Sequence, residues 1–305
     1  MRNAYLDELH ALAGSNPRIL ALVADNGAIV YDRFREDYPG RFLNFGISEA
    51  NMIGAASGLA ACGWLPFCYT ISGFMTMRAF EQVRNDVCLQ EMNVKLVGIG
   101  AGFVYSDLGP THHATEDLAL MRVLPGMTVF SPADRLEAGK ATAAAAALEG
   151  PVYIRLSRGN SPVIYENDYE FCPGRGVVLR DGTDGYLVGT GEILRDVLEA
   201  AELLGKRGIR AGVLNIHTLK PFDAELLVSS AASGAILTVE EHNVIGGLGS
   251  AAAEALLEAG CGKVSFRRLG LRDSFAREYG THAEMKEMNG LSAGRIADEF
   301  EKLLS

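Results

Sequence analysis

Residues 41–61 read RFLNFGISEANMIGAASGLAA, and this stretch decides the fold class. A short apolar run ends at Gly46, a carboxylate follows at Glu49, and small and apolar residues continue without a helix breaker. The pattern is typical of a strand that leads through a tight turn into a helix packed closely on a sheet. Taken alone, Ser48 and Glu49 could simply be helix-capping residues, because acidic side chains are favoured in a first helical turn.

The same rhythm of strand and helix repeats along the first half of the chain. Helical patterns occupy residues 3–13, 51–61, 75–90, 114–122 and 134–148, and between them apolar runs predict strands at 19–23, 94–99, 127–130 and 152–156. Strands that are apolar along their whole length indicate a parallel sheet covered on both faces. We therefore predict an α/β domain over residues 1–165.

A change of composition near residues 162–173 predicts the end of this domain. Aromatic, acidic and proline residues replace the alternation there, which is typical of an interdomain linker, and we place it at 166–175. Strands at 185–188, 211–215, 235–239 and 264–269 then alternate with helices at 193–206, 223–230 and 249–259. We expect a second, smaller α/β domain over 176–305, so that each domain buries a core of its own.

Composition excludes several classes of function. The formal net charge is −10 and Lys and Arg are scattered, which argues against nucleic acid as a partner. No apolar stretch reaches the ~20 residues that span a bilayer, and acidic residues near the N-terminus argue against a signal peptide. The five cysteines form no CxxC pair and fit small buried side chains in a reducing compartment. We expect a cytoplasmic protein.

Two further segments carry chemistry-bearing side chains directly after predicted strands. GPTHHATEDL spans residues 109–118 and YIRLSRGN spans 153–160, at the loop edge where open α/β folds collect ligand groups. A histidine pair after Gly-Pro also suggests a metal, but no Cys or further His lies near in sequence, so we predict no metal ligands in this chain. Arg155 and Arg158 suit a small oxyanion, or are surface charges at a strand end.

Four segments together resemble the pyrimidine-binding and C-terminal domains of transketolases and of the related 1-deoxyxylulose-5-phosphate synthases. The segments are FGISEANMIGAASGLA at 45–60, GPTHHATEDLALMRVLPGMTVFSPAD at 109–134, PVYIRLSRGNSPVIY at 151–165 and TVEEHNVIGGLGSAAAEAL at 238–256. The resemblance covers essentially the whole chain in family order. It implies a thiamine-diphosphate enzyme that transfers a two-carbon ketol unit from a ketose, or ketose phosphate, to an aldose or aldehyde acceptor.

The resemblance also implies which residues bind the cofactor. Glu49 matches the glutamate that the family presents to the pyrimidine ring, where a carboxyl group activates the cofactor, so we expect Glu49 to be catalytic as well as cofactor-binding. Phe74 matches the aromatic residue stacked on that ring, and Phe80 follows at a later helical step. Apolar residues at this spacing also occur on ordinary core faces, so the register of the stacking residue stays open.

Substrate contacts follow from the same resemblance. His112 falls on the family histidine that contacts the substrate and its reacting hydroxyl groups, and His113 replaces the usual glutamine. Arg158 matches the arginine that binds the terminal phosphate of the sugar, while Arg155 resembles the extra arginine of the deoxyxylulose-phosphate synthases. We expect His112 to be catalytic, and all four side chains to bind substrate.

Three positions depart from the family pattern. Transketolases usually have a histidine where this chain has Gly100, an aspartate near Leu108 and a phosphate-binding serine near Ile29. These departures argue against the usual pentose-phosphate substrates. We expect an anionic substrate, carrying phosphate or sulfonate, that is held mainly by arginine.

The family's diphosphate-binding domain has no counterpart in this sequence. That domain holds Mg²⁺ through Gly-Asp-Gly and a later Asn, and no Gly-Asp-Gly occurs in the 305 residues. We therefore expect a separate N-terminal transketolase subunit to carry the motif, to hold Mg²⁺ and the diphosphate, and to assemble with this chain as an α2β2 heterotetramer. Activity should require this partner.

Other functions stay open at this point. A β subunit of a 2-oxo acid dehydrogenase has the same two domains, but its histidine segment differs from Gly109-Pro110-Thr111-His112. A carboligase like deoxyxylulose-phosphate synthase is a second alternative. A scaffold without catalysis is a third, which the presence of Glu49, His112 and Arg158 argues against.

Overall fold

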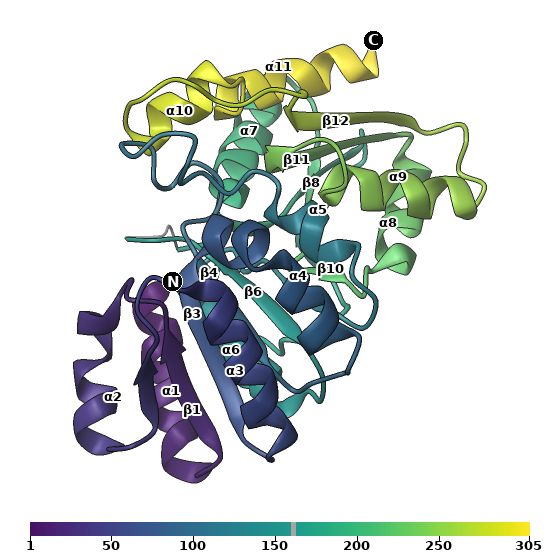
Figure 1. The fold of residues 1–305 in the computed structure, drawn as a ribbon. Coiled ribbons are helices and arrows are strands. Elements are labelled where there is room, and N and C mark those ends of the chain that lie inside the picture. Colours follow the sequence, from purple (N-terminus) through teal and green to yellow (C-terminus); the bar gives the residue numbers. More distant parts are fainter. Residues whose placement is uncertain (160–162) are drawn as a thin grey trace.

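The computed structural model describes residues 1–159 and 163–305 and shows two α/β units, each built on its own sheet (Figure 1). The first sheet has seven strands in the order β10-β5-β6-β4-β3-β1-β2, and the second has five in the order β12-β11-β8-β9-β7. Only β10 and β7 pair antiparallel with their neighbours among these strands. The predicted architecture of two mostly parallel α/β units is confirmed.

The first unit contains most of the elements predicted for it. Its strands are β1 (Ile19–Val23), β2 (Phe42–Asn44), β3 (Leu65–Ile71), β4 (Lys95–Ile99), β5 (Thr128–Phe130) and β6 (Val152–Leu156). Its helices are α1 (Arg2–Ser15), α2 (Asp32–Asp37), α3 (Glu49–Ala61), α4 (Phe80–Gln82), α5 (Asp117–Arg122) and α6 (Arg135–Ala147), with the short helices η1 (Ala28–Tyr31), η2 (Phe74–Arg78) and η3 (Val83–Cys88). The single helix predicted over 75–90 is thus divided, because η2 and η3 are π-helical turns on either side of α4.

Side chains of β1 show how the first sheet is covered on both faces. Leu20 and Leu22 pack into one core with α3, whereas Ile19, Ala21 and Val23 pack into another with α1 and α6. This alternation follows from the two-residue period of a strand. In Figure 1, α3 and α4 accordingly lie on one side of the sheet, with α1 and α6 on the other.

The second unit lies above the first in Figure 1 and ends in the yellow helix α11. Its strands are β7 (Val177–Arg180), β8 (Tyr186–Gly189), β9 (Gly212–Asn215), β11 (Ala235–Asn243) and β12 (Ser265–Leu271). Its helices are η4 (Gly191–Ile193), α7 (Leu194–Lys206), α8 (Ala224–Ser230), η5 (Ala231–Ser233), α9 (Leu248–Glu258), α10 (His282–Met288) and α11 (Ala293–Leu304). Strand β10 (Thr218–Lys220) comes from this half of the chain but pairs with β5 in the first sheet.

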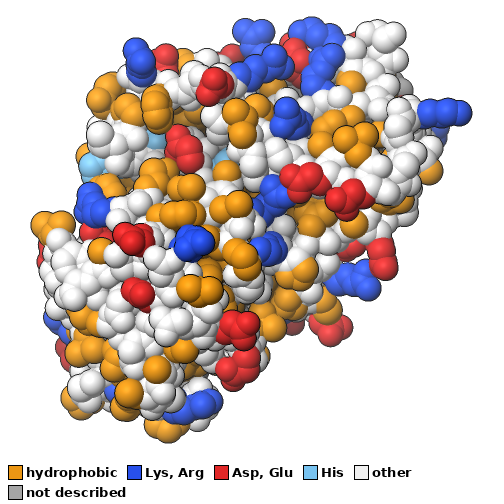
Figure 2. Space-filling model, turned by 45° about the vertical axis from the view of Figure 1, so that its right-hand side comes forward, with side chains coloured by type: hydrophobic (Ala, Val, Ile, Leu, Met, Phe, Trp, Pro, Cys, Tyr) orange, Lys and Arg blue, Asp and Glu red, His pale blue; other side chains and the backbone are white. Residues whose placement is uncertain are grey.

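Charge is distributed evenly on the face that Figure 2 draws, where acidic and basic side chains are interspersed with hydrophobic ones. Neither sign of charge forms a continuous area in that view. Of the helices in the described ranges 1–159 and 163–305, none is long and apolar enough to cross a membrane.

Candidate active site

Parallel strands bring the predicted site residues to one edge of the first sheet. Glu49 follows β2, Phe74 follows β3, His112 lies in the loop after β4, and Arg158 follows β6. These strands are neighbours within the order β6-β4-β3-β1-β2, so their carboxyl ends meet at the same edge. Residues more than 100 positions apart in the sequence therefore belong to one candidate site.

Glu49 is buried at the first position of α3, and its carboxylate is paired with an arginine. The Glu49 side chain is 2% exposed, and its Oε2 accepts a hydrogen bond of 2.8 Å from Nη1 of Arg78. Ser48, the residue before the helix, makes no side-chain capping bond. The carboxylate is thus directed toward Arg78 at the end of η2, which favours a role in the site over helix capping.

Phe74 lies between Arg78 and His112. The Arg78 guanidinium carbon lies 4.2 Å from the centre of the Phe74 ring, in a cation–π contact. The rings of Phe74 and His112 also meet edge to face, with their centres 5.2 Å apart. Nδ1 of His112 is 3.0 Å from the hydroxyl of Thr111, which helps to fix the orientation of the imidazole.

Tyr105 connects His112 to Arg158. Its ring centre is 6.1 Å from that of His112, and the Arg158 guanidinium carbon lies 5.2 Å from the Tyr105 ring centre. Tyr105 itself is buried, and burial raises the pKa of its hydroxyl. Contacts therefore run without a break from Glu49 through Arg78, Phe74, His112 and Tyr105 to Arg158.

Gly100 makes room for the Tyr105 ring. Its φ of +91° is a conformation that L side chains rarely adopt, and a Cβ at this position would overlap the ring of Tyr105. At the position where the resemblance expects a histidine, the space is thus filled by an aromatic ring from five residues further on. The other two departures are exposed apolar side chains at the same edge, Ile29 in η1 and Leu108 in the loop after β4.

The two adjacent histidines have different surroundings. His112 is half-buried beside Phe74, whereas His113 is 5% exposed and its ring meets Phe103 edge to face. Burial lowers the pKa of His113, and its Nε2 has no hydrogen-bond partner among the described residues. Substrate binding by His113 stays a prediction, which requires access to a side chain that the fold now covers.

Arg155 does not fit the anion-binding role that we predicted for it. Its side chain is 3% exposed, Nε donates to Oδ2 of Asp117 at 2.8 Å, and Nη2 donates to the carbonyls of Ala114 and Glu241. The bonds to Asp117, Ala114 and Glu241 connect α5, the β4–α5 loop and β11, so Arg155 is a structural connection between the two units. Arg158, by contrast, is exposed at the mouth of the site.

Phe80 is only half-buried and packs against the core on the α3 side. The Phe74 ring, by contrast, contacts Arg78 and His112 and packs against the core on the α1 side of the sheet. Cofactor binding by Phe80 therefore stays a prediction. Sequence reasoning missed Arg78 and Tyr105; the small residue at Gly100 was the one available signal that a neighbouring side chain fills that space.

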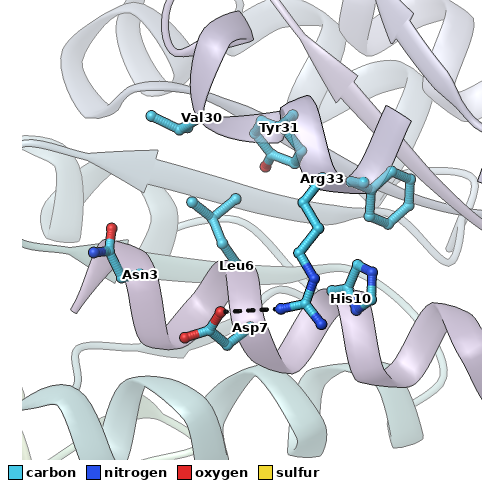
Figure 3. Close-up of a pocket in the computed structure, with 8 residues that line it drawn as sticks. Asn3, Leu6, Asp7, His10, Val30, Tyr31 and Arg33 are labelled. Carbon is cyan, nitrogen blue, oxygen red and sulfur yellow. Dashed lines mark ion pairs between the residues drawn. The ribbon is translucent and has the colours of Figure 1, made fainter. Parts of the chain in front are cut away.

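A separate surface pocket of about 240 Å³ lies between α1 and the segment formed by η1 and α2 (Figure 3). Figure 3 shows Arg33 reaching across it toward Asp7, and the two side chains are 3.9 Å apart and exposed. None of the predicted site residues lines this pocket. We therefore place the candidate active site at the sheet edge.

Comparison with known proteins identifies the family of the chain. Residues 1–163 match the family "Transketolase, pyrimidine binding domain", and residues 174–296 match "Transketolase, C-terminal domain". The chain is 44% identical to 6-deoxy-6-sulfo-D-fructose transketolase subunit SqwH of Clostridium sp. (strain MSTE9), over 97% of this chain and 92% of that protein. It is 36% identical to 1-deoxy-D-xylulose-5-phosphate synthase 1 of Geobacter sulfurreducens, over 98% of this chain and 47% of that protein.

A solved structure gives the same result. The chain superimposes on a structure described as "Split gene transketolase, inactive beta4 tetramer" with a TM-score of 0.89 and 42% sequence identity, over 99% of this chain and 97% of the other. The chain thus matches both domain families, and it matches relatives over nearly its full length, so its family can be assigned. The chain belongs to the transketolase family, and it contains the pyrimidine-binding and C-terminal domains of that family.

Proposed function

We propose that this chain is the pyrimidine-binding subunit of a thiamine-diphosphate-dependent transketolase, which transfers a two-carbon ketol unit from a ketose to an aldehyde acceptor. The observation that carries the proposal is the continuous series of contacts from Glu49 to Arg158 at one sheet edge. A buried carboxylate, an aromatic face, an imidazole and an exposed guanidinium follow one another along it. A 2-oxo acid dehydrogenase subunit is less compatible with the relatives, which are transketolases and deoxyxylulose-phosphate synthases.

The residues at one end of the series fit the pyrimidine ring of the cofactor. The carboxyl group of Glu49 would share a proton with a ring nitrogen, and the face of Phe74 would stack on the ring. When bound, thiamine diphosphate supplies the thiazolium that stabilises negative charge on the transferred ketol carbon. The task of Glu49 is to hold a proton at the ring, and burial of this carboxylate excludes competing water.

The other end of the series fits a sugar with a terminal anion. His112 would contact the reacting hydroxyl groups, and Arg158 would bind the anion through charge-assisted hydrogen bonds. The names of the two relatives above contain a sulfonated sugar, 6-deoxy-6-sulfo-D-fructose, and a sugar phosphate, 1-deoxy-D-xylulose-5-phosphate. We therefore infer a terminally anionic ketose as donor, with the Tyr105 ring setting the separation between Arg158 and His112.

A partner subunit would complete the site by holding Mg²⁺ and the diphosphate, in an α2β2 assembly. Exposed apolar side chains at the edge that carries Glu49 support a covering surface, because such groups mark protein contacts when they cluster: Ile29 is 78% exposed and Ile47 79%. A β4 tetramer of a similar split transketolase is described as inactive, which is consistent with dependence on a second subunit.

Reconstitution tests the proposal. We expect the chain alone to bind thiamine diphosphate weakly with Mg²⁺, and an N-terminal transketolase subunit with a Gly-Asp-Gly motif to restore tight binding and ketol transfer in a coupled assay. Glu49→Gln should then lower kcat by orders of magnitude without loss of fold. If this variant kept more than about a tenth of the wild-type kcat, a barrier change under ~1.4 kcal/mol, Glu49 would not be the catalytic carboxylate.

A further inference from the structure

Arg78 contacts the same two side chains, Glu49 and Phe74, that we propose to bind the pyrimidine ring of the cofactor. Its Nη1 lies 2.8 Å from Oε2 of Glu49, and its guanidinium carbon lies 4.2 Å from the centre of the Phe74 ring. A flat, hydrogen-bonding group thus covers an aromatic face and engages a buried carboxylate at the same time. An aminopyrimidine ring that stacks on Phe74 and donates to Glu49 needs the same face and the same carboxylate.

We propose that Arg78 is a positioning residue that occupies the pyrimidine site in the free chain and leaves it when the cofactor ring enters. This inference rests on the proposed function and adds that a side chain of the protein competes with the cofactor ring for its site. The guanidinium satisfies Glu49 before binding, and the ring takes over both contacts afterwards. Arg78 therefore weakens binding of the ring while keeping the carboxylate ready for it.

Burial explains why Glu49 needs such a placeholder. Its side chain is 2% exposed, and a buried carboxylate without a partner is costly in free energy. Arg78 supplies a positive charge without closing the site, because its own side chain is 49% exposed. A guanidinium that is half in solvent loses little when it swings away, since partly exposed ion pairs and cation–π contacts are weak.

The neighbours of Phe74 support an exchange at one face of the ring. His112 meets Phe74 edge to face, with centres 5.2 Å apart, and Thr111 contacts the imidazole. His112 can therefore stay in place when Arg78 leaves. The segment around Arg78 offers a matched control in Arg84, an exposed arginine of η3 that pairs with the side chain of Asn85.

The test measures affinity for the aminopyrimidine half of thiamine, a neutral probe that needs neither Mg²⁺ nor the diphosphate site. Isothermal titration of the full chain should show roughly three- to tenfold tighter binding in Arg78→Ala and in Arg78→Gln than in wild type, the size expected for loss of a partly exposed pair. Arg84→Ala should bind as wild type does. Raising the salt concentration should narrow the difference, because it screens the Arg78–Glu49 pair.

The outcomes separate this inference from the proposed function. Weaker binding in both Arg78 variants would overturn the placeholder role and would make Arg78 a direct ligand of the ring. Affinity equal to that of wild type would also overturn the placeholder role, because it would show that Arg78 does not compete with the ring. If the reconstituted complex nevertheless binds thiamine diphosphate and transfers ketol units, the proposed function is supported and only the placeholder role of Arg78 is rejected. Failure of the complex to bind thiamine diphosphate at all would overturn both.

Discussion

Two arginine–carboxylate pairs of the first unit have the same bond length and different surroundings. Arg78–Glu49 and Arg155–Asp117 are each 2.8 Å apart. The Arg78 side chain is 49% exposed, whereas those of Arg155 and Asp117 are 3% and 0% exposed. We infer from the comparison that the exposure of an ion pair, rather than its bond length, decides whether a ligand can replace one partner.

Additional bonds reinforce the buried pair. The hydroxyl of Tyr153 donates to the same Oδ2 of Asp117 at 2.7 Å, and Nη2 of Arg155 donates to the carbonyl of Ala114 at 2.7 Å. Every one of these groups is buried. A buried network of this kind loses much when one member is removed, because the remaining polar groups have no access to water.

Removal of Arg155 should therefore have the largest effect. We expect Arg155→Ala to lower the free energy of unfolding by about 3–5 kcal/mol, because Asp117 is left as a buried charge. Arg78→Ala, the matched change in the open pair, should cost less, because loss of this half-exposed side chain gives water access to the carboxylate of Glu49. Urea unfolding of both variants measures the difference, and equal losses would show that exposure does not separate the pairs.

Arg158, which forms no ion pair with the carboxylates of the described residues, is the next most sensitive position. We expect Arg158→Ala in the reconstituted enzyme to raise KM for the anionic substrate by about one to two decades, with kcat within a few fold, since charge-assisted bonds contribute ~1.5–3 kcal/mol and uniform binding affects KM. Steady-state kinetics with the anionic substrate and an uncharged analogue provide the test. An equal loss for both substrates would mean that Arg158 shapes the loop and does not read the anion.

Glu137 extends the comparison to a buried carboxylate that bonds to no arginine within residues 1–159 and 163–305. Its oxygens accept from the Tyr169 hydroxyl, the Asn215 amide and the Ala133 N–H, yet burial raises the pKa of Glu137 to about 7. A raised carboxyl pKa stabilises the fold fully below the ordinary value of 4.5 and loses that contribution as pH rises through about 7.

We therefore expect the melting temperature to fall by a few degrees more between pH 5.5 and 8 in wild type than in Glu137→Gln, which does not titrate. Differential scanning calorimetry of both proteins at the two pH values measures this. Parallel pH dependence in the two proteins would assign the effect to other groups.

Local sequence predicted best the strands that are buried on both faces. The bounds of β1 and β6 agree with their apolar runs, because both strands are buried on each face. Strand β3 (Leu65–Ile71) was not predicted, since Pro66 at its second position argues against a strand, although the strand is central in the sheet. Its place is fixed by pairing with β1 and β4, which lies outside any local window.

Partners distant in sequence account for what could not be predicted at the candidate site. The role of Arg155 depends on Asp117, 38 residues away, and the setting of Glu49 depends on Arg78, 29 residues away. The positions of Glu49, Phe74, His112 and Arg158 at one edge could be anticipated, because each follows a strand of a parallel sheet. Their neighbours could not, because loop conformation decides which side chains meet.

Strand β10 has a consequence for how this architecture can be rearranged by recombination. Thr218–Lys220 closes the first sheet beside β5, and the N–H of Ser131 donates to the carbonyl of His217 at 2.8 Å. A gene exchange with its crossover at the linker predicted over 166–175 would replace the edge strand of the upstream sheet together with the downstream unit. An unmatched replacement would leave the backbone of β5 unpaired and prone to self-association. We therefore expect recombination to transfer the coding sequences of the two units together.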